Sequence, residues 1–569
     1  MNPKTKVAAQ DLIKMIQVEN RAEYFRYKSE TEAPLSLICD RADALGPLKL
    51  HQKIGFAQYI LRGEVFYSRF RPGDRVDIRT QKAGSDYSDK FSDGWRVDSI
   101  SYPSPGKIEV VISGVGPFEE DGVKEVFLFK SSSTLFNGIL IRKISEMSRS
   151  DEPILLGNER RALAANHPEF KRHYNNLNDG QKIAVHSLIG NNLTGAIQGP
   201  PGTGKTQLLR SIISLGLSSN MKVGITSLTN AAVDNLLGRI VSGAFAHDWV
   251  RVGDADRVNR DLYHGDLQNV NFVVRGFSKE VNEIALIAST LHKLAFNWKS
   301  APKFDLLVID EAGQVPIYFW PFIQRMTKRL VLVGDQFQLP PVLSAEHVNL
   351  PANNIFALCV DKETPMLETQ YRMRREIQAW SSEKFYKGRL LPHKTVVNRD
   401  YFAHHPAFLS DGFVVPKKFD SNSTGKGSQI EADFIVDKVE KLVRTREDLT
   451  TVGVICPYRA QAGIVNASLQ NRLGVATASR ILVDTVERFQ GQEREAIFLS
   501  FGGGGNSQHD LRFLSDPRRL NVAVTRAKSR FFCLFDEGLL ERSTGKQSED
   551  LNEFLRWVSD GRVAIRKAA

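Results

Sequence analysis

The chain has 569 residues, of which 42% are hydrophobic and 25% are charged, an ordinary composition for a soluble globular protein. No run of ~18 uncharged apolar residues is present and the N-terminus lacks the apolar core of a signal peptide, which argues against a membrane span. The net charge of +11 is compatible with a polyanionic partner but is also common in proteins that bind none. We therefore expect a cytoplasmic protein, or a nuclear one if the source is eukaryotic, with about three or four domains of ~150 residues each.

Cysteine usage indicates a reducing compartment and no metal cluster. The cysteines are Cys39, Cys359, Cys456 and Cys533, which lie far apart and form no C-x-x-C pair. The 12 histidines show no spacing typical of metal ligands. We therefore expect neither structural zinc nor an iron–sulfur cluster.

The N-terminal quarter of the chain predicts a helical segment followed by a small β-barrel. Residues 1–30 place apolar side chains on one helical face, and the segment 1–59 has no assigned role. From about residue 60 to 130, short β-type runs alternate with Gly and Pro turns at roughly 10-residue intervals, a pattern typical of a barrel. A helical pattern follows Ser133, a candidate cap. We predict a β-barrel with stalk helices over residues 60–147.

Two α/β domains are predicted after the barrel. From residue 177 onward, apolar strand-like runs alternate with helical patterns, and the alternation restarts after about residue 361. Because the runs are almost continuously apolar, we expect parallel strands buried on both faces. The predicted domains cover residues 148–360 and 361–569.

A glycine-rich loop in the first α/β domain predicts ATP binding. Residues Gly199–Thr206 read G-x-x-x-x-G-K-[ST], with a strand-like run before them and a helical pattern after them. Lys205 is expected to reach the β- and γ-phosphates, and the Thr206 hydroxyl to hold Mg²⁺. The backbone of the loop is expected to face the phosphates. Its remaining residues are Gly199, Pro200, Pro201, Gly202, Thr203 and Gly204.

Three residues after later strand-like runs are candidates for the hydrolysis step. Asp310 and Glu311 close the run 304–309, and we expect Asp310 to hold Mg²⁺ through water and Glu311 to deprotonate the attacking water. The alternative is a solvated acidic turn. Gln338 follows the next run, 329–333, and is a candidate sensor of the γ-phosphate.

Four further residues are candidates for contacts with the nucleotide. Gln181 lies roughly 20 residues before the loop, and its amide is suited to the N6 and N7 edges of adenine, although alone it reads as an exposed helix residue. Tyr371 is a candidate to stack on adenine. Arg372 and Arg526, in the second domain, are candidate arginine fingers that reach across a cleft, with surface ion pairs as the alternative.

Taken in order, these residues resemble the motifs of superfamily 1 helicases over roughly 177–540. The resemblance is closest to the branch containing the nonsense-mediated-decay RNA helicase, senataxin and the immunoglobulin-mu-binding helicase. It implies two tandem RecA-like P-loop domains, preceded by a β-barrel with stalk helices, and 5′ to 3′ translocation. The matching segments are Gln181, Gly199–Thr206, Ser227–Asn230, Asp310–Gln314, Gly334–Pro340, Gln370–Met373, Val483–Glu493 and Asn521–Lys528.

The resemblance also implies roles that spacing alone does not show. Gly491 and Glu493 match the motif that links the nucleotide to the strand. The zinc domain and the nuclease-linked iron–sulfur cluster of some relatives have no counterpart here, so we expect a compact, monomeric helicase core. Residues expected to contact the nucleic-acid backbone are Thr229, Asn230, Ser289, Thr290, Pro457, Tyr458 and Thr485.

The sequence thus predicts a nucleic-acid-stimulated ATPase that uses ATP and Mg²⁺ to unwind duplexes 5′ to 3′. Two alternatives stay open: a translocase that remodels nucleoprotein without efficient unwinding, and an ATP-gated binding scaffold. The expected partner is single-stranded DNA or RNA. We favour DNA because no RNA-decay accessory domain is present, although discrimination depends on contacts to the 2′-OH that a sequence does not display.

Overall fold

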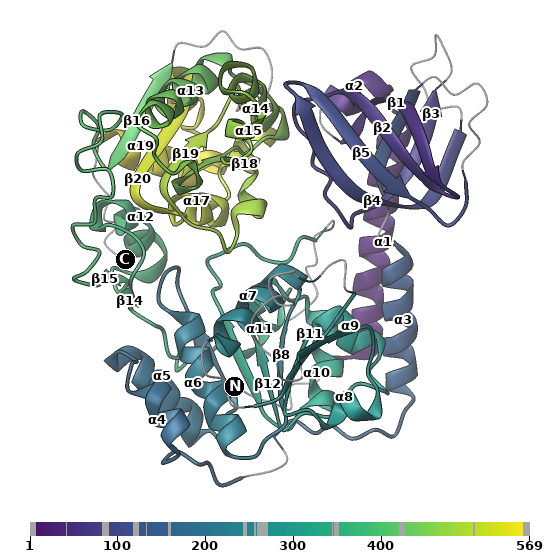
Figure 1. Cartoon of the computed structure of the whole chain (residues 1–569). Helices are drawn as coiled ribbons and strands as arrows, with labels where there is room; N and C mark the ends of the chain where they lie inside the picture. The colour runs from purple at the N-terminus through teal and green to yellow at the C-terminus, as the bar shows by residue number, and fades with distance from the viewer. Residues whose placement is uncertain are drawn as a thin grey trace. The chain divides into compact units, whose positions relative to one another are not determined.

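The computed structural model describes residues 7–560 except for 41–42, 82–89, 118–124, 132–133, 158–160, 243–246, 255–257, 259–270, 344, 346–351, 420–426 and 505–506. Figure 1 labels the helices and strands in chain order. The chain forms two compact units, each built from two separate stretches. Unit 1 comprises Met1–Tyr24 and Ser133–Tyr371, and unit 2 comprises Phe25–Ser132 and Arg372–Ala569.

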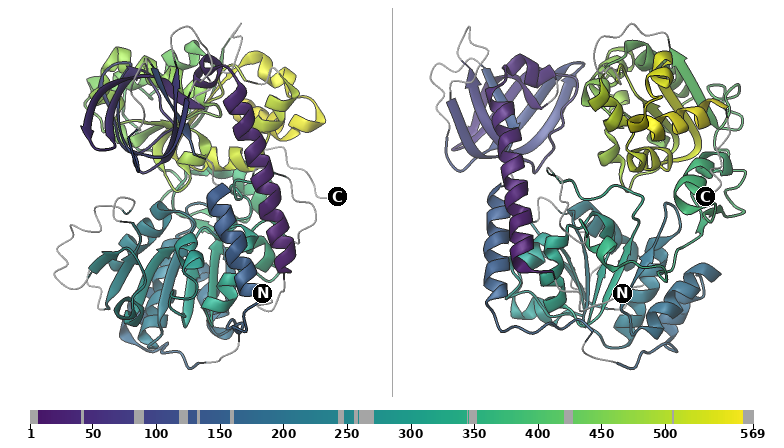
Figure 2. Two further views of the ribbon diagram at one scale, coloured as in Figure 1. Left: turned by 90° about the vertical axis from the view of Figure 1, so that its right-hand side faces the viewer. Right: turned by 180° about the vertical axis from the view of Figure 1, so that it is seen from behind.

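The predicted barrel is present in unit 2 as a closed antiparallel sheet with the strand order β1-β2-β5-β4-β3-β6 (Figures 1 and 2). Alternate side chains fill its interior, as Ile108, Val110 and Ile112 of β5 show. The strands are β1 (Ala44–Gly55), β2 (Gln58–Glu64), β3 (Arg75–Gln81), β4 (Lys90–Ser104), β5 (Lys107–Ser113) and β6 (Glu125–Lys130).

The barrel begins before the expected boundary at residue 60, because β1 lies within the segment 1–59. Leu45 and Leu48 of β1 are buried, but residues 51–55 are all exposed. The outer half of this strand therefore lacks the alternation of apolar and polar residues that indicates a half-buried strand.

Helices lie before and after the barrel, and the one after it falls in the segment predicted to contain the stalk. Helix α1 (Ala9–Glu32) contributes Leu12, Met15 and Ile16 to a core cluster of unit 1, which also contains Leu140 and Ile144 of α3 (Thr134–Ser148). These positions have the spacing of one helical face. The short helix α2 (Leu35–Asp40) precedes β1.

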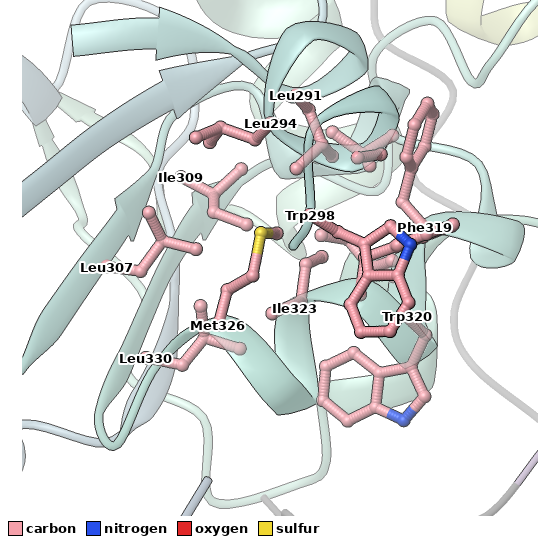
Figure 3. Close-up of a cluster of buried hydrophobic side chains, with 14 of the residues drawn as sticks. Leu291, Leu294, Trp298, Leu307, Ile309, Phe319, Trp320, Ile323, Met326 and Leu330 are labelled. Atoms are coloured by element: carbon pink, nitrogen blue, oxygen red, sulfur yellow. The ribbon is translucent and has the colours of Figure 1, made fainter. Parts of the chain in front are cut away.

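Unit 1 contains a parallel sheet with the order β10-β9-β11-β8-β12-β13-β7. Its central strands are buried at every position, as the apolar runs predicted. Leu307 and Ile309 of β12 point into a cluster with helices α9 and α10 (Figure 3). Leu306 and Val308 point into a second cluster with α6. The strands are β7 (Gly195–Gln198), β8 (Val223–Ser227), β9 (Trp249–Val252), β10 (Asn271–Val274), β11 (Leu286–Thr290), β12 (Leu306–Ile309) and β13 (Leu330–Gly334).

Helices surround this sheet, and a short strand, β14 (Thr369–Gln370), ends the unit. The helices are α4 (Pro168–Tyr174), α5 (Asp179–Gly190), α6 (Lys205–Ser218), α7 (Asn230–Val241), α8 (Lys279–Glu283), α9 (Leu291–Phe296), α10 (Trp320–Met326) and α11 (Ile355–Cys359). Among the described helices of the whole chain, none is long and apolar enough to cross a membrane.

Unit 2 contains a second parallel sheet, with the order β16-β20-β19-β17-β18, which confirms the predicted pair of α/β domains. Its strands are β16 (Val414–Phe419), β17 (Val452–Ile455), β18 (Leu482–Asp484), β19 (Arg494–Ser500) and β20 (Ala527–Asp536), and β15 (Leu391–Pro392) lies outside it. Its helices are α12 (Arg375–Tyr386), α13 (Gln429–Arg444), α14 (Arg459–Leu473), α15 (Val475–Ala478), α16 (Gln508–Leu514), α17 (Pro517–Val524), α18 (Glu537–Arg542) and α19 (Glu549–Asp560).

Candidate nucleotide and nucleic-acid sites

The glycine-rich loop connects β7 to the start of α6, as expected. Gly202 and Gly204 have φ values of 76° and 75°, in the left-handed region that favours glycine. The Gly199 N–H donates to the Gly334 carbonyl over 2.8 Å, which ties the loop to β13. Lys205 Nζ donates to the Gly199 carbonyl over 2.9 Å. The lysine therefore lies across the loop in which phosphates are expected.

The acidic pair directly follows β12. Asp310 accepts a 2.9 Å hydrogen bond from the Glu311 N–H through Oδ1, and Glu311 itself has a φ of 52°, uncommon for a residue other than glycine. Burial, reinforced by the Glu311 charge, raises the pKa of Asp310 to about 6, while Lys205 opposes the shift. A bound cation would favour the charged carboxylate.

The corner formed by Thr206 and Asp310 fits a magnesium ion, because a hydroxyl and a carboxylate are the oxygen donors that this hard cation prefers. Arg239 of α7, which the sequence did not single out, donates through Nη1 to Thr206 Oγ1 over 3.4 Å. Its positive charge also opposes the rise in the pKa of Asp310. Among the described residues, no group of three or more His, Cys, Asp or Glu side chains could hold another metal ion.

Gln338 is held at the end of β13 by an aspartate that sequence reasoning missed. Its Nε2 donates to Asp335 Oδ2 over 3.1 Å, and the other oxygen of Asp335 accepts from the Phe337 N–H at 3.2 Å. Asp335 directly follows the apolar strand, which is the signal that identified Asp310. The structure thus places Gln338 in the loop after β13, a strand that neighbours β12, and its role as a γ-phosphate sensor stays a prediction.

Gln181 braces the glycine-rich loop. It is buried, and its Nε2 donates to the Thr203 carbonyl over 3.0 Å. Its Oε1 accepts from the Asn178 N–H at 3.0 Å, completing a capping box on α5. The alternative, an exposed helix residue, is therefore excluded, and the adenine contact stays a prediction.

Tyr371 joins the same group in unit 1. Its backbone N–H donates to the Gly202 carbonyl over 2.8 Å. Its hydroxyl accepts a 2.7 Å hydrogen bond from Asn178 Nδ2. The phenol ring is therefore held beside both the loop and the cap of α5, and stacking on adenine stays a prediction.

The candidate arginines cluster with Glu493 in unit 2. Arg372 donates to Glu493 Oε2 over 2.6 Å and to the Thr525 carbonyl over 3.0 Å. Lys528 lies 2.8 Å from the other oxygen of Glu493. Although burial alone would raise the pKa of Glu493, the Arg372 and Lys528 charges lower it to about 2. Glu493 is therefore a carboxylate at any physiological pH.

Arg526 is more enclosed than Arg372. Only 2% of it is exposed, and its guanidinium donates to the Val522 and Gln492 carbonyls and to Thr525 Oγ1. Gly491, with a φ of 78°, lies one residue before Gln492. The structure therefore brings together the four residues of unit 2 that are candidates for contact with the nucleotide. The roles of Arg372 and Arg526 as arginine fingers stay predictions.

The four candidate strand contacts of unit 1 lie at one sheet edge. The parallel strands β8 and β11 are neighbours, with Ser227 opposite Thr290. Thr229 caps α7 and Thr290 caps α9, each by accepting a backbone N–H. Asn230 opens α7, and Ser289 is buried on β11. These four residues thus lie at the carboxyl ends of adjacent parallel strands or directly after them, and their contacts with nucleic acid stay predictions.

In unit 2, Pro457 and Tyr458 follow β17, and Thr485 follows the neighbouring strand β18. The Tyr458 ring stacks on Phe513 at 5.4 Å between centroids, and its hydroxyl donates to Asp510 over 3.3 Å. Tyr458 is only 8% exposed. The three candidates lie at the carboxyl ends of neighbouring strands of one sheet, but little of the Tyr458 side chain is exposed for contact with nucleic acid.

Barrel residues reach the carboxylate that precedes Thr485. Asp484 is buried and accepts from the Thr485 N–H at 2.8 Å. It also accepts from the Tyr67 hydroxyl at 3.2 Å and forms an ion pair with Arg71, both from the segment between β2 and β3. Burial raises the pKa of Tyr67 well above its usual range. No spacing in the sequence indicates these contacts, because the partners lie more than 400 residues apart.

Comparisons with known proteins agree with this geometry. Residues 176–398 and 352–537 each match a family described as an AAA domain. The chain is 27% identical over 474 residues to the DNA polymerase alpha-associated DNA helicase A of Saccharomyces cerevisiae, covering 68% of this chain and 69% of the relative.

Two further relatives show the same percentage of sequence identity to this chain. An uncharacterized ATP-dependent helicase of Methanocaldococcus jannaschii is 27% identical over 487 residues, covering 67% of this chain and 70% of the relative. The DNA replication ATP-dependent helicase/nuclease DNA2 of Homo sapiens is 27% identical over 403 residues. That match covers 63% of this chain but only 37% of the human protein, so it leaves most of that protein without a counterpart.

Proposed function

The chain belongs to the superfamily 1 helicases, in the branch that contains the nonsense-mediated-decay RNA helicase, and on that premise we propose that it moves 5′ to 3′ along a single strand and unwinds duplexes. The observation that carries the proposal is the convergence of Lys205, Asp310 and Gln338 at the carboxyl ends of three neighbouring strands. This arrangement is suited to hydrolysing ATP.

In the proposed reaction, the loop backbone and Lys205 hold the phosphates of ATP. Mg²⁺ held by Thr206 and, through water, by Asp310 would supply charge neutralisation at the β- and γ-phosphates. Glu311 orients the attacking water and takes its proton. Gln181 and Asn178 keep the loop in the conformation in which its N–H groups face the phosphates.

We propose that Arg372 and Arg526 stabilise the charge that develops on the transferred phosphoryl group. One of the boundaries between the two units falls between Tyr371 and Arg372. Tyr371 is bonded to Gly202 of the loop, whereas Arg372 is bonded to Glu493. The residue that contacts the loop and the residue that belongs to the arginine cluster are thus neighbours in the chain. This connection supports coupling of ATP hydrolysis to movement of the second unit.

The proposed track is single-stranded nucleic acid, held through phosphate and sugar by the polar edges of the two sheets. Such contacts bind with little sequence preference and weaken steeply with salt. We favour DNA because the yeast relative is named as a DNA helicase and the human relative as a DNA replication helicase/nuclease.

The rate of ATP hydrolysis with and without a single strand tests the proposal. We expect added oligo-dT to raise the rate, and Lys205→Ala to abolish hydrolysis under both conditions. A wild-type rate that is indifferent to both oligo-dT and oligo-U would refute the proposed function. Stimulation of ATP hydrolysis by a single strand, without separation of tailed duplexes, would instead favour a translocase that remodels nucleoprotein.

A further inference from the structure

A fully buried arginine lies next to the residues of unit 1 that are proposed to bind single-stranded nucleic acid. Arg251 is on β9, and its side chain is completely shielded from solvent. Burying a guanidinium is costly unless its charge and its N–H donors are all matched. The partners of Arg251 therefore indicate what its burial achieves.

Each nitrogen of the Arg251 guanidinium bonds to a different group. Nε donates to Asp234 Oδ1 on α7 over 2.7 Å, and Nη1 donates to the Val252 carbonyl over 2.7 Å. Nη2 donates to Asn230 Oδ1, also over 2.7 Å. Gly253 leaves room for this arrangement, because a Cβ there would lie 2.9 Å from Arg251 Nη1.

Asp234 neutralises the charge, and the Val252 carbonyl satisfies a further donor. The third bond has a further consequence. Asn230 is a predicted strand contact, and only its carbonyl oxygen can accept from a guanidinium. Since the amide is planar, its Nδ2 group is turned away from Arg251. Among the described residues, that Nδ2 group has no hydrogen-bond partner.

A second residue predicted to contact nucleic acid lies beside the same arginine. Ser289 Oγ donates to the Val252 carbonyl over 3.0 Å, so Ser289 and Arg251 share one acceptor. Ser289 and Val252 are also opposite each other on the neighbouring strands β11 and β9. Arg251 thus connects Asn230 and Ser289 from below the sheet edge.

We propose that Arg251 is a positioning residue that orients the Asn230 amide so that its NH₂ group donates to a phosphate or sugar oxygen of the bound strand. The inference rests on the proposed function, since it assumes that a strand occupies this edge. It assigns a direction to the Asn230 contact: the side chain acts as a donor, and its acceptor oxygen is already used.

Two substitutions of Asn230 distinguish this arrangement from a structural one. Asn230→Ala removes the donor and is expected to weaken binding of fluorescein-labelled 20-nucleotide oligo-dT or oligo-U about tenfold, the effect of one hydrogen bond to a charged group. Asn230→Asp keeps an acceptor for Arg251 but turns a negative oxygen toward the strand. Asn230→Asp should therefore bind the oligonucleotide at least as weakly as Asn230→Ala. The difference in affinity between the two variants should narrow as salt rises from about 50 to 300 mM.

A structural role predicts the opposite order. If Asn230 served only to accept from Arg251, Asn230→Asp would bind like the wild type, and that result would overturn the inference. Asn235 lies exposed on the same helix and provides matched controls. Asn235→Ala and Asn235→Asp should leave strand affinity within about twofold of wild type; a loss equal to that at Asn230 would show that any change on α7 suffices and would also overturn the inference. Thermal unfolding checks that each variant is folded.

A double-mutant cycle tests Arg251 itself. Arg251→Lys can keep the ion pair with Asp234, but its single ammonium group cannot reproduce the fork that holds Asn230. We expect it to weaken strand binding about as much as Asn230→Ala, and the double variant to lose no more than about threefold beyond either single one. Additive losses of about 100-fold would contradict the coupling. If the wild type binds neither oligonucleotide, the proposed function fails; if it binds and the Asn230 variants bind equally well, only this inference fails.

Discussion

Glu431 provides a stability test of unit 2, because it is a buried acid that accepts two hydrogen bonds through one carboxyl oxygen. Its Oε2 accepts from Ser500 Oγ at 2.6 Å and from the Gly502 N–H at 3.0 Å. Burial raises the pKa of Glu431 to about 8. The glycine-rich segment that begins at Gly502 packs against Tyr458, since a Cβ at Gly504 would lie 2.4 Å from that ring.

A raised pKa means that the folded protein keeps a proton that the unfolded chain has lost. The contribution of Glu431 to stability is therefore full below about pH 4.5 and declines as pH rises towards 8. Between pH 5 and pH 8 the decline amounts to about 3 kcal/mol. The glutamine in Glu431→Gln offers a carbonyl oxygen to the same two donors and has no proton to lose. We expect it to abolish this part of the pH dependence.

The assay compares the thermal unfolding of the wild type and Glu431→Gln between pH 5 and pH 8. The variant should gain on the wild type as pH rises, by about 6–12 °C at pH 8 if each kcal/mol shifts the midpoint by about 2–4 °C. Using the difference between the two proteins removes the contribution of the other titrating groups. Parallel pH profiles, or a variant that is less stable at pH 8, would refute the reasoning.

Three further predictions concern function. Glu311→Gln should lower the rate of ATP hydrolysis by about 10²–10⁴-fold, as expected for loss of a general base, while fluorescent ATP still binds; unaltered turnover would exclude that role. Arg372→Lys keeps the positive charge but not the bidentate fork, so strand-stimulated hydrolysis should fall at least about tenfold, and a wild-type rate would argue against a finger. Asp484→Asn, which removes the ion pair with Arg71 beside Thr485, should weaken oligo-dT binding in anisotropy titrations, whereas unchanged affinity would make that contact purely structural.

The residues predicted for the nucleotide site could be named from the sequence because they occupy short contiguous motifs at strand ends. Gly199–Thr206 carries its own context of strand, loop and helix, and Asp310 directly follows an apolar run. Side-chain periodicity likewise identified β7, β8, β12 and β13 of the first sheet and β17 to β20 of the second, but not the buried strands β9 and β11. It missed β1 of the barrel, whose residues 51–55 are exposed and so carry no burial signal.

The supporting residues could not be predicted because their partners are distant in the chain. Arg251 reads as one charge in an apolar strand until folding places it under Asn230. Tyr67 and Asp484 meet only in the folded unit 2. Taken alone, Gln181 reads as an exposed helix residue, because its burial depends on the Thr203 carbonyl, which lies 22 residues away. Periodicity and motif spacing describe local structure and contain no information on such pairings.

The central claim is that ATP hydrolysis drives movement 5′ to 3′ along a single strand. The most direct measurement is strand separation of DNA and RNA duplexes that carry either a 5′ or a 3′ single-stranded tail, with Lys205→Ala as the control. We predict ATP-dependent separation of the 5′-tailed duplexes by the wild type alone. Separation that requires a 3′ tail, or that proceeds equally with Lys205→Ala, would contradict the account.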